Sequence, residues 1–336
     1  MTAQSAADSV AIAVIGTGAF GTALAVHLVS LGHRVALCGR NVAHIDSIRQ
    51  TGVHDRVVEG FKVPKTIDLF VGLPQLDEFD AVLIATSCSG FESALEQIRA
   101  QGFSGAVVWA CKGFSPGTAD LLSTRVPAHF GEDHPMAVIS GPSFAAELAV
   151  GMPTALSVAG NSLDISEKVS QWFHGNNLRT YVQFDMTGVQ VGGAIKNVYA
   201  IAAGISDGLG FGANARSALI TRGLAEMTRL GVEMGAAHNT FLGLSGLGDL
   251  TLTCTDNQSR NRRYGLAVAD GMSDEAALAK VGQAVEGRIT ARTAKVLADR
   301  YDVECPIIEQ VYQVVYQNLA PSDAVAALLS RSIKSE

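Results

Sequence analysis

A lysine at position 196 stands inside an otherwise apolar helical pattern that includes Ile195, Val198 and Ile201. Burying an ammonium group costs free energy unless the group is paired or used, so this lysine requires a partner or a chemical role. The alternative is a solvated surface lysine, which is the commoner case for a single lysine on a helix. A held ammonium group can donate a proton in a reaction, which makes Lys196 a candidate general acid.

Other polar residues could share a site with Lys196. Asp249 would accept a hydrogen bond from Lys196 and favour the ammonium form as proton donor. Arg260 and Asn261 belong to a basic cluster at 259–263, and with the lysine they offer donors suited to a small phosphate, which arginine binds through two hydrogen bonds. The alternative interpretation of this cluster is a basic surface helix.

The first half of the chain carries a glycine-rich turn. An apolar run at 11–15 leads directly into Gly-Thr-Gly-Ala-Phe-Gly at 16–21, and a helical pattern follows. In this order of strand, turn and helix, Gly16 permits the tight turn and Gly18 lets backbone amides approach a pyrophosphate at the helix N-terminus. Gly21 lets the helix pack closely on the strand. The pattern predicts a dinucleotide site, with a plain glycine-rich turn as the alternative.

Arg40 follows the second expected strand, at 34–38. An NAD-preferring fold often carries Asp or Glu at this point to bind the ribose 2′-hydroxyl, and no carboxylate is there. Arg40 is placed to meet a 2′-phosphate, which favours NADP(H), although an arginine stacked on adenine would also tolerate NAD(H). A solvated loop arginine is the alternative.

Apolar runs that alternate with helical segments predict a parallel sheet covered on both faces. Ligands of such sheets bind at the carboxyl ends of strands, and three expected ends carry polar residues, at 86–87, 111–113 and 140–143. Lys112 is therefore expected to point toward the cofactor cleft, the alternative being a surface loop lysine. The expected strands are 11–15, 34–38, 81–85, 106–110, 136–139, 154–158 and 178–182.

The pattern changes near 188–193 to long helices rich in Ala and Leu, which indicates a domain boundary. We expect an α/β fold in which a Rossmann-like parallel-sheet N-terminal domain, 8–190, precedes an all-helical C-terminal domain, 191–336. Glycines also cluster at 208–212, in a link between two expected helices. They would permit a ligand to approach the backbone, or they simply mark a loop.

Composition and charge exclude several classes of protein. The 336 residues are 48% hydrophobic, enough for two cores, and the net charge of −7 argues against a nucleic-acid partner. No run is long and apolar enough for membrane insertion, and no signal peptide is visible. The five cysteines form no Cys-x-x-Cys pair or zinc-type cluster, so we expect no metal and a cytoplasmic location.

Several motifs in order resemble those of bacterial NAD(P)-dependent glycerol-3-phosphate dehydrogenases. The resemblance runs from about residue 12 to about residue 287. Its strongest block is Lys-Asn-Val-Tyr-Ala-Ile-Ala-Ala-Gly at 196–204, and the ordered set is more specific than any single motif. The other matching segments are 16–25, 111–113, 140–145, 207–210, 214–216, 246–250 and 259–263.

The resemblance implies reduction of dihydroxyacetone phosphate to sn-glycerol 3-phosphate by hydride from NAD(P)H, which would supply glycerophospholipid synthesis. Lys196 matches the family's catalytic lysine, and Lys112 and Asp249 would act with it. A homodimer through the Ala-rich helices of the second domain is also expected. The positions that match the family's substrate site are Lys112, Gly141, Ser143, Lys196, Asp249, Ser259, Arg260 and Asn261.

The glycine turn, Arg40 and Lys112 are already expected on the cofactor side. The resemblance adds Ala145, Arg260, Ala284 and Glu286. The turn itself departs from the family, which commonly has serine and then Trp or Tyr where this chain has Ala19 and Phe20. Loss of the hydroxyl removes a phosphate contact, which bears on cofactor affinity rather than on reaction type. The expected cofactor contacts are Gly16, Gly18, Ala19, Phe20, Gly21, Arg40, Lys112, Ala145, Arg260, Ala284 and Glu286.

Three other functions compete with this interpretation. A β-hydroxyacid-type dehydrogenase would share the two-domain plan, but Lys112 and the cluster at 259–261 favour a phosphate-bearing ketone. A regulatory protein that only senses dinucleotides would tolerate loss of Lys196 and Asp249. A methyltransferase also uses a glycine turn after its first strand, but it would leave a helical domain with paired lysines unexplained.

Overall fold

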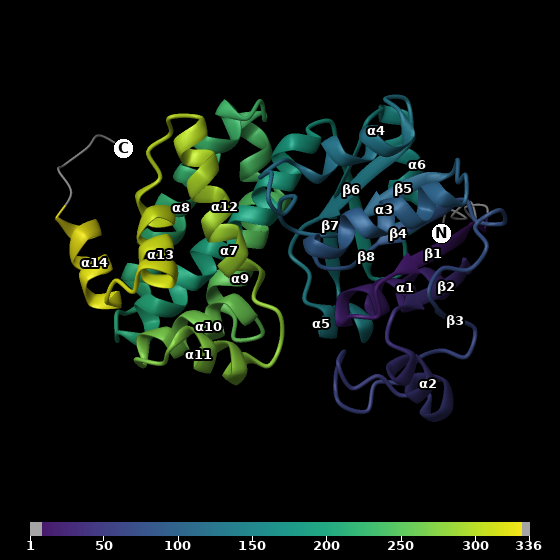
Figure 1. The fold of residues 1–336 in the computed structure, drawn as a ribbon, viewed down its shortest axis with the longest axis horizontal. Coiled ribbons are helices and arrows are strands. Elements are labelled where there is room, and N and C mark those ends of the chain that lie inside the picture. The colour runs from purple at the N-terminus through teal and green to yellow at the C-terminus, as the bar shows by residue number, and fades with distance from the viewer. Residues whose placement is uncertain (1–8, 331–336) are drawn as a thin grey trace, which may run out of the picture. The chain divides into compact units, whose positions relative to one another are not determined.

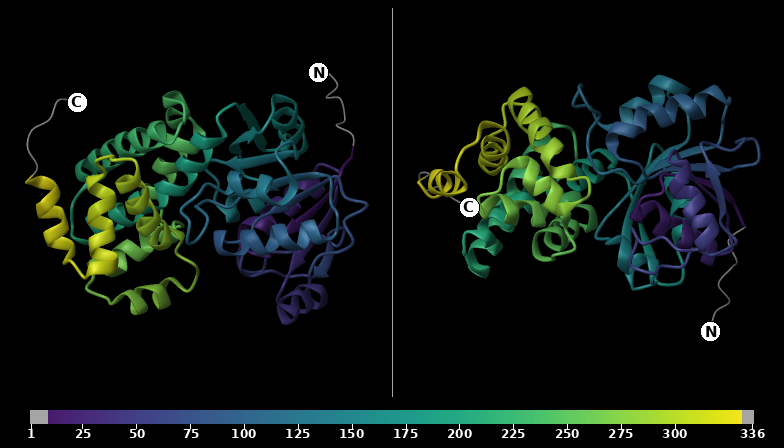
Figure 2. Two further views of the ribbon diagram at one scale, coloured as in Figure 1. Left: turned by 45° about the horizontal axis from the view of Figure 1, so that its top comes forward. Right: turned by 60° about the horizontal axis from the view of Figure 1, so that its bottom comes forward.

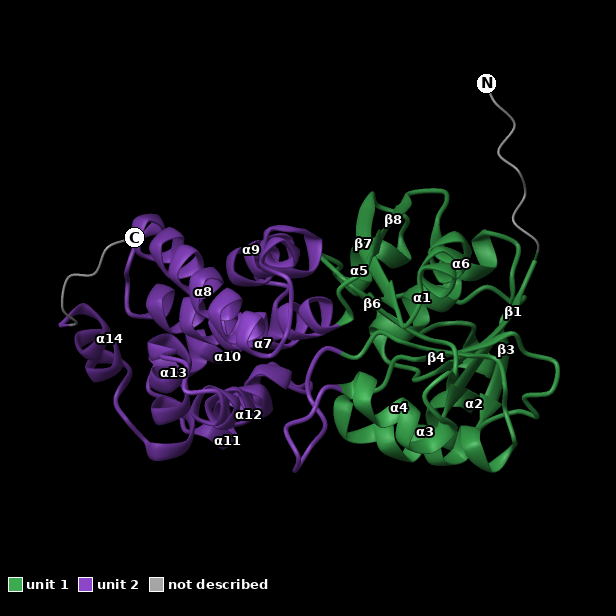
Figure 3. Ribbon diagram, turned by 90° about the horizontal axis from the view of Figure 1, so that it is seen from above, with its two compact units in different colours: residues 1–111, 122–186 green, residues 112–121, 187–336 purple. Residues whose placement is uncertain are grey.

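The structure, a computed structural model, describes residues 9–330, which divide into two compact units (Figure 1). Within the described residues, the first unit comprises 9–111 and 122–186, and the second comprises 112–121 and 187–330 (Figure 3). Lys112 therefore belongs to the second unit, although the chain on both sides of its segment belongs to the first. No pattern in the sequence indicates this insertion.

An eight-stranded sheet forms the centre of the first unit, in the order β3-β2-β1-β4-β5-β6-β7-β8. All seven predicted strands are present, whereas the short edge strand β3 is not predicted from the sequence. The central strands β4, β5 and β6 are buried along their whole length, which is why they are continuous apolar runs. The strands are β1 Ala11–Ile15, β2 Arg34–Gly39, β3 Asp68–Val71, β4 Ala81–Ile84, β5 Ala106–Trp109, β6 Met136–Ser140, β7 Thr154–Gly160 and β8 Leu178–Gln183.

One strand pair departs from the predicted parallel arrangement. Strands β6 and β7 are antiparallel, and β7 pairs in parallel with β8, so the last two strands run opposite to the other six. The link between β6 and β7 contains only the five-residue helix α5, Ala145–Ala149. Such a helix rises about 7.5 Å, too little to return the chain along the sheet as a parallel crossover requires.

Helices cover both faces of the sheet. Helices α1, α5 and α6 lie on one face, and α3 and α4 lie on the other (Figure 3). Short 3₁₀ turns at Cys88–Gly90 and Leu122–Thr124 lead into α3 and α4. The bounds are α1 Ala19–Ser30, α2 Val42–Thr51, α3 Phe91–Ala100, α4 Arg125–Phe130 and α6 Leu163–Phe173.

The second unit is helical, and its long helix α7, Met186–Gly208, is buried at every position from 188 to 206. A helix that is buried all round needs neighbours on every side, and among the described residues α8, α10 and α12 are three of them. Helix α14 packs on α13 at the outer edge of the unit (Figure 2, yellow). The helices after α7 are α8 Ala213–Glu233, α9 Asp249–Thr255, α10 Arg260–Ala269, α11 Asp274–Val281, α12 Glu286–Arg300, α13 Pro306–Gln317 and α14 Pro321–Leu329.

Close packing accounts for several glycines of α7. A Cβ at Gly204 would overlap the carbonyl oxygen of Arg262 in α10, and a Cβ at Gly208 would lie 2.5 Å from that of Ala269. Helix α7 thus runs beyond its predicted end, and only residues 209–212 link it to α8. The sequence left two interpretations of these glycines, a close approach of a ligand and a simple loop. Neither describes Gly208, which lies in α7 and allows that helix to contact α10.

Candidate active site

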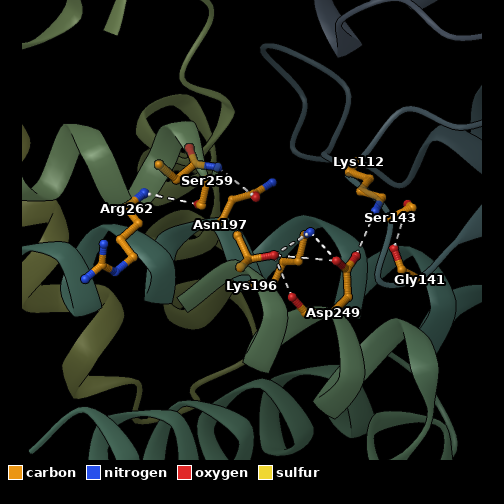
Figure 4. A network of polar contacts seen from close by, with 10 residues as sticks. Lys112, Gly141, Ser143, Lys196, Asn197, Asp249, Ser259 and Arg262 are labelled. Atoms are coloured by element: carbon orange, nitrogen blue, oxygen red, sulfur yellow. Dashed lines mark hydrogen bonds and ion pairs between the residues drawn. The ribbon is translucent and has the colours of Figure 1, made fainter. Parts of the chain in front are cut away.

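Lys196 lies in the middle of α7 with only 6% of its surface exposed. Its Nζ donates hydrogen bonds to Oδ1 of Asp249 at 2.5 Å and to Oγ1 of Thr253 at 2.8 Å (Figure 4). Asp249 is the first residue of α9 and is 1% exposed. The hydrogen bond predicted between Lys196 and Asp249 is therefore confirmed, and the solvated-lysine alternative is wrong.

Lys112 binds the other oxygen of the same carboxylate. Its Nζ lies 2.8 Å from Oδ2 of Asp249, and its side chain is 16% exposed (Figure 4). Two ammonium groups against one buried carboxylate leave a net positive charge. Such a charge suits an anionic substrate group or an oxygen on which negative charge develops during reaction.

The environment of Lys196 shifts its protonation toward neutrality. Burial is the main cause, and the charge of Lys112 acts in the same direction, whereas Asp249 favours the ammonium form. Together these effects lower the pKa of Lys196 from 10.5 to about 8. A general acid or base works best when its pKa lies near the working pH, and a pKa of about 8 meets that condition.

Thr253 fixes the direction of the lysine. Its hydroxyl donates to the carbonyl oxygen of Asp249 at 2.6 Å, which leaves the oxygen to accept from Lys196. No role is predicted for Thr253 from the sequence. The available signal is its spacing, because residues four apart on a helix share one face, and α9 begins at Asp249.

An amide network lies beside the lysine on α7. Nδ2 of Asn261 donates to Oδ1 of Asn197 at 2.8 Å, and Oδ1 of Asn261 accepts from the backbone N–H of Gly287 at 2.8 Å. Ser259 caps helix α10 by accepting from the N–H of Arg262 at 3.2 Å (Figure 4). Asn261 thus contacts Asn197, the residue that follows Lys196 in α7, and this proximity is consistent with a shared site.

The basic cluster at 259–263 is divided in two. Arg262 is buried, and its guanidinium binds Asp207 at 2.5 Å and also contacts Asn257. Arg216 binds the same Asp207 at 2.9 Å, so this group ties α7, α8 and α10 together. Arg260 is exposed instead. A basic surface helix therefore does not describe the cluster as a whole.

Two residues predicted beside the cofactor influence each other's charge. Surrounding groups desolvate the charge of Arg260 although part of its side chain is exposed, and this lowers its pKa. Desolvation raises the pKa of Glu286, and the opposite charges of the two residues act against both shifts. Glu286 is the first residue of α12. Ala284 is exposed in the loop before that helix. These three residues gather near the start of α10 and of α12.

The glycine turn of the first unit has the shape of a phosphate cradle. Gly16 has a φ of +124°, and a Cβ there would lie 2.6 Å from the carbonyl oxygen of Ala85. A Cβ at Gly18 would meet nothing within 4 Å, and no side chain caps the N-terminus of α1. Open space at an uncapped helix N-terminus fits a pyrophosphate. Arg40 is exposed directly after β2.

Other predicted contacts of the first unit lie in the first turn of α1 and between β6 and α5. Phe20 and Ala145 both pack against the core of the sheet, and their helices α1 and α5 are in contact. Gly141 follows β6 with a φ of +149°. The hydroxyl of Ser143 donates to the carbonyl oxygen of Gly141 at 3.0 Å (Figure 4). Their roles toward a ligand remain predictions.

A sheet with an open dinucleotide cradle, in a chain that also holds a buried lysine paired with a carboxylate, is typical of a nicotinamide-dependent oxidoreductase. Comparison with known proteins names the family. The N-terminal and C-terminal regions described as NAD-dependent glycerol-3-phosphate dehydrogenase match residues 11–166 and 185–326. The chain belongs to the NAD-dependent glycerol-3-phosphate dehydrogenase family.

Individual relatives agree over the whole chain. A glycerol-3-phosphate dehydrogenase named for NAD(P)+ from Shewanella sp. strain MR-4 is 47% identical over 332 residues, 98% of each chain. One from Pseudoalteromonas translucida is 46% identical over 97% of this chain and 98% of its own. The crystal structure of glycerol-3-phosphate dehydrogenase from Coxiella burnetii is 40% identical, with a TM-score of 0.92 over 96% of this chain and 99% of that chain.

These findings confirm the predicted family, fold class and NAD(P) cofactor class. Among residues 9–330, no cluster of His, Cys, Asp and Glu could hold a metal ion. Within the same residues, no helix combines the length and apolar character of a membrane span.

Proposed function

We propose that this chain interconverts dihydroxyacetone phosphate and sn-glycerol 3-phosphate with NAD(P)H and so supplies glycerophospholipid synthesis. Family membership supports the reaction, and the buried hydrogen bond between Lys196 and Asp249 is the observation that carries its chemistry. We assign the cofactor to an N-terminal domain, 8–190, and most substrate contacts to a helical domain, 191–336. The bound nicotinamide supplies the hydride.

Lys196 is the proposed proton donor in the direction of reduction. A ketone that gains a hydride develops negative charge on its oxygen, and the ammonium group stabilises that charge and then protonates the oxygen. Asp249 keeps the lysine charged, and Thr253 aims it. Proton transfer of this kind contributes about 10²- to 10⁴-fold to a rate. With a pKa of about 8, Lys196 also accepts the proton in the reverse reaction.

The substrate phosphate is proposed to bind Arg260 and Asn261, with Ser259, Gly141 and Ser143 as further contacts. Arg260 offers a charged group that grips phosphate through paired hydrogen bonds. Asn261 is already oriented by Asn197, which adjoins the lysine in α7. Binding energy from the phosphate would hold the ketone in position against Lys196 and Lys112.

Arg40 and the glycine turn are proposed to hold the cofactor, with Ala145, Arg260, Ala284 and Glu286 as further contacts. The exposed arginine after β2 supports a preference for NADP(H), since its charge matches a 2′-phosphate. Ala19 offers no hydroxyl to the pyrophosphate, so backbone N–H groups of the turn carry that contact.

A homodimer is proposed through the helical unit. A groove of about 1430 Å³ is lined by Val232 of α8, Val314 of α13 and Leu329 of α14, and Leu329 is 78% exposed. A second copy would cover these apolar side chains. Light scattering should give twice the chain mass of 35.1 kDa, and Leu329→Asp should shift it toward one copy. A single-copy mass for the unaltered chain would contradict the dimer.

All five cysteines are buried thiols, which supports the proposed cytoplasmic location. The function is tested by the oxidation of NADPH and NADH, followed by absorbance, with dihydroxyacetone phosphate, unphosphorylated dihydroxyacetone and a panel of oxo acids. Turnover that requires the phosphate is the expected result. Turnover with an oxo acid alone would indicate a hydroxyacid dehydrogenase, and cofactor binding without turnover would indicate a regulatory protein.

A further inference from the structure

Two histidines meet beside the glycine turn of the first unit. Nε2 of His54 lies 2.9 Å from the carbonyl oxygen of Thr17, the second residue of that turn, and 3.2 Å from Nε2 of His44. The rings stand edge to face with centroids 4.7 Å apart. His54 is 1% exposed, whereas His44 is partly exposed in the first turn of α2. This histidine pair links the dinucleotide cradle to α2.

The contacts couple the protonation of the two rings. A neutral imidazole carries one proton, which Nε2 of His54 can give fully to Thr17 or to His44 but not to both. Nδ1 of His54 is buried without a hydrogen-bond partner, so a proton is better placed on Nε2, where Thr17 accepts it. Two charged rings at 3.2 Å would repel each other. An extra proton at this pair is therefore best placed on His44, the more exposed of the two rings.

His44 lies close in the chain to the proposed 2′-phosphate ligand. Arg40 is followed by Asn41, whose side chain accepts a hydrogen bond from the N–H of His44 at 2.9 Å and so begins α2. The first turn of a helix is also the end that attracts anions. Arg40 and His44 thus bracket the N-terminus of α2.

We propose that His44 is a specificity-determining residue for the cofactor. When the pair formed with His54 takes up a proton, its charge acts with Arg40 on the 2′-phosphate and favours NADP(H) over NAD(H). The ribose 2′-hydroxyl of NAD(H) carries no charge and gains nothing from that proton. This inference rests on the proposed cofactor site at Arg40.

The surroundings of His44 oppose its protonation before the cofactor binds. Burial first, and then the charges of His54 and Arg56, hold the pKa of His44 below its usual value, while the Thr17 carbonyl acts in the opposite direction. A bound phosphate dianion would raise that pKa. NADPH should therefore take up a proton when it binds, and its affinity should increase as the pH falls.

Neighbouring carboxylates are engaged elsewhere. Asp46 of α2 binds Arg49 at 2.5 Å, and Asp55 accepts a hydrogen bond from the N–H of Gly60 at 2.8 Å. The charges that act on His44 from the surrounding segments are thus positive, and the phosphate would be their counterion.

Calorimetric titration of the full chain with NADPH and with NADH, in two buffers of different ionisation enthalpy, measures the protons taken up. The unaltered chain should take up more protons with NADPH than with NADH near pH 7. Its preference for NADPH, as a ratio of dissociation constants, should rise about tenfold from pH 8 to pH 6, the effect of one pKa unit. In His44→Gln the extra proton uptake should disappear and the preference should change less with pH.

Two variants complete the design. His54→Gln keeps an amide donor for the Thr17 carbonyl and removes the ring that opposes protonation of His44, so it should retain NADH affinity and keep the extra proton uptake with NADPH. His238→Gln, at an exposed histidine of the second unit, is the matched control and should behave as the unaltered chain. Because the 2′-phosphate also titrates, the comparison between variants isolates the protein's contribution.

Equal proton uptake and equal pH dependence in His44→Gln and His238→Gln would overturn the inference. Equal uptake of protons with NADPH and NADH by the unaltered chain would do the same, even if the variants fail to fold. If the unaltered chain binds neither dinucleotide, the proposed cofactor site itself is wrong. The two failures are therefore distinguishable.

Discussion

Lys112 and Lys196 bind the two oxygens of a single buried carboxylate, that of Asp249, at 2.8 and 2.5 Å. The carboxylate compensates one of the two positive charges. The positive charge of Lys112 also opposes protonation of Lys196, which lies in the buried part of α7. The charge of Lys112 thus helps to set the pH at which Lys196 gives up its proton.

The two directions of the reaction should respond to pH in opposite ways. Reduction needs the Lys196 ammonium, so its kcat should fall as the pH rises through about 8, the pKa of that group. Oxidation of glycerol 3-phosphate needs the neutral amine, so its kcat should rise through the same pH. Steady-state rates from pH 6 to 10 check this, and profiles that change in the same sense would contradict the proton-transfer role.

Lys112→Met should move that midpoint to higher pH. The positive charge of Lys112 lowers the pKa of Lys196, so its removal makes the ammonium easier to keep. The residual reduction rate is measured across the same pH range. Lys65→Met, at an exposed lysine of the first unit, is the control and should leave the midpoint unchanged. A midpoint that stays or falls in Lys112→Met would show that the two ammonium groups are not coupled.

Thr253→Val should lower kcat by about 10- to 100-fold with little change in KM, because Lys196 loses one hydrogen bond to its charged group. Thr253→Ser keeps the hydroxyl and should retain most of the rate. Both replacement side chains are close to threonine in volume. The comparison therefore separates the effect of the hydrogen bond on the orientation of Lys196 from an effect of packing. Similar rates in the two variants would argue against a positioning role.

Arg260 and Arg262 should differ in what their loss does. Arg260→Ala should raise the KM for dihydroxyacetone phosphate by about 10- to 100-fold through the lost phosphate contact. Arg262→Ala should lower the free energy of unfolding by about 3 kcal/mol, because it leaves the buried Asp207 with one cation fewer. Steady-state kinetics measure the first effect and thermal unfolding measures the second. A raised KM in Arg262→Ala together with a loss of stability in Arg260→Ala would contradict the assignment of the two roles.

Fold and site differ in how far the sequence predicts them. Buried strands and the glycine turn are visible because a covered parallel sheet needs continuous apolar runs and a phosphate cradle needs glycine. Lys196 is visible because a charge in an apolar helix needs a reason. Each of these patterns lies within a short stretch of sequence, so it can be recognised without knowledge of the packing.

Other features depend on contacts between distant residues. Arg262 pairs with Asp207 across 55 positions of sequence, and Lys112 meets Asp249 across 137, so neither contact leaves a local pattern. The reversal of β7 depends on a short link whose helix holds five residues, and this length is known only when the helix ends are seen. The histidine pair requires a loop after α2 to fold back on the glycine turn.

The central claim is that Lys196 supplies the proton, whereas binding of the cofactor does not depend on Lys196. Single-turnover oxidation of bound NADPH by dihydroxyacetone phosphate, in the unaltered chain and in Lys196→Met, tests it most directly, with cofactor affinity measured in parallel by fluorescence. We predict unchanged NADPH affinity and a rate about 10²- to 10⁴-fold lower in the variant. Equal rates in the two proteins would contradict the account.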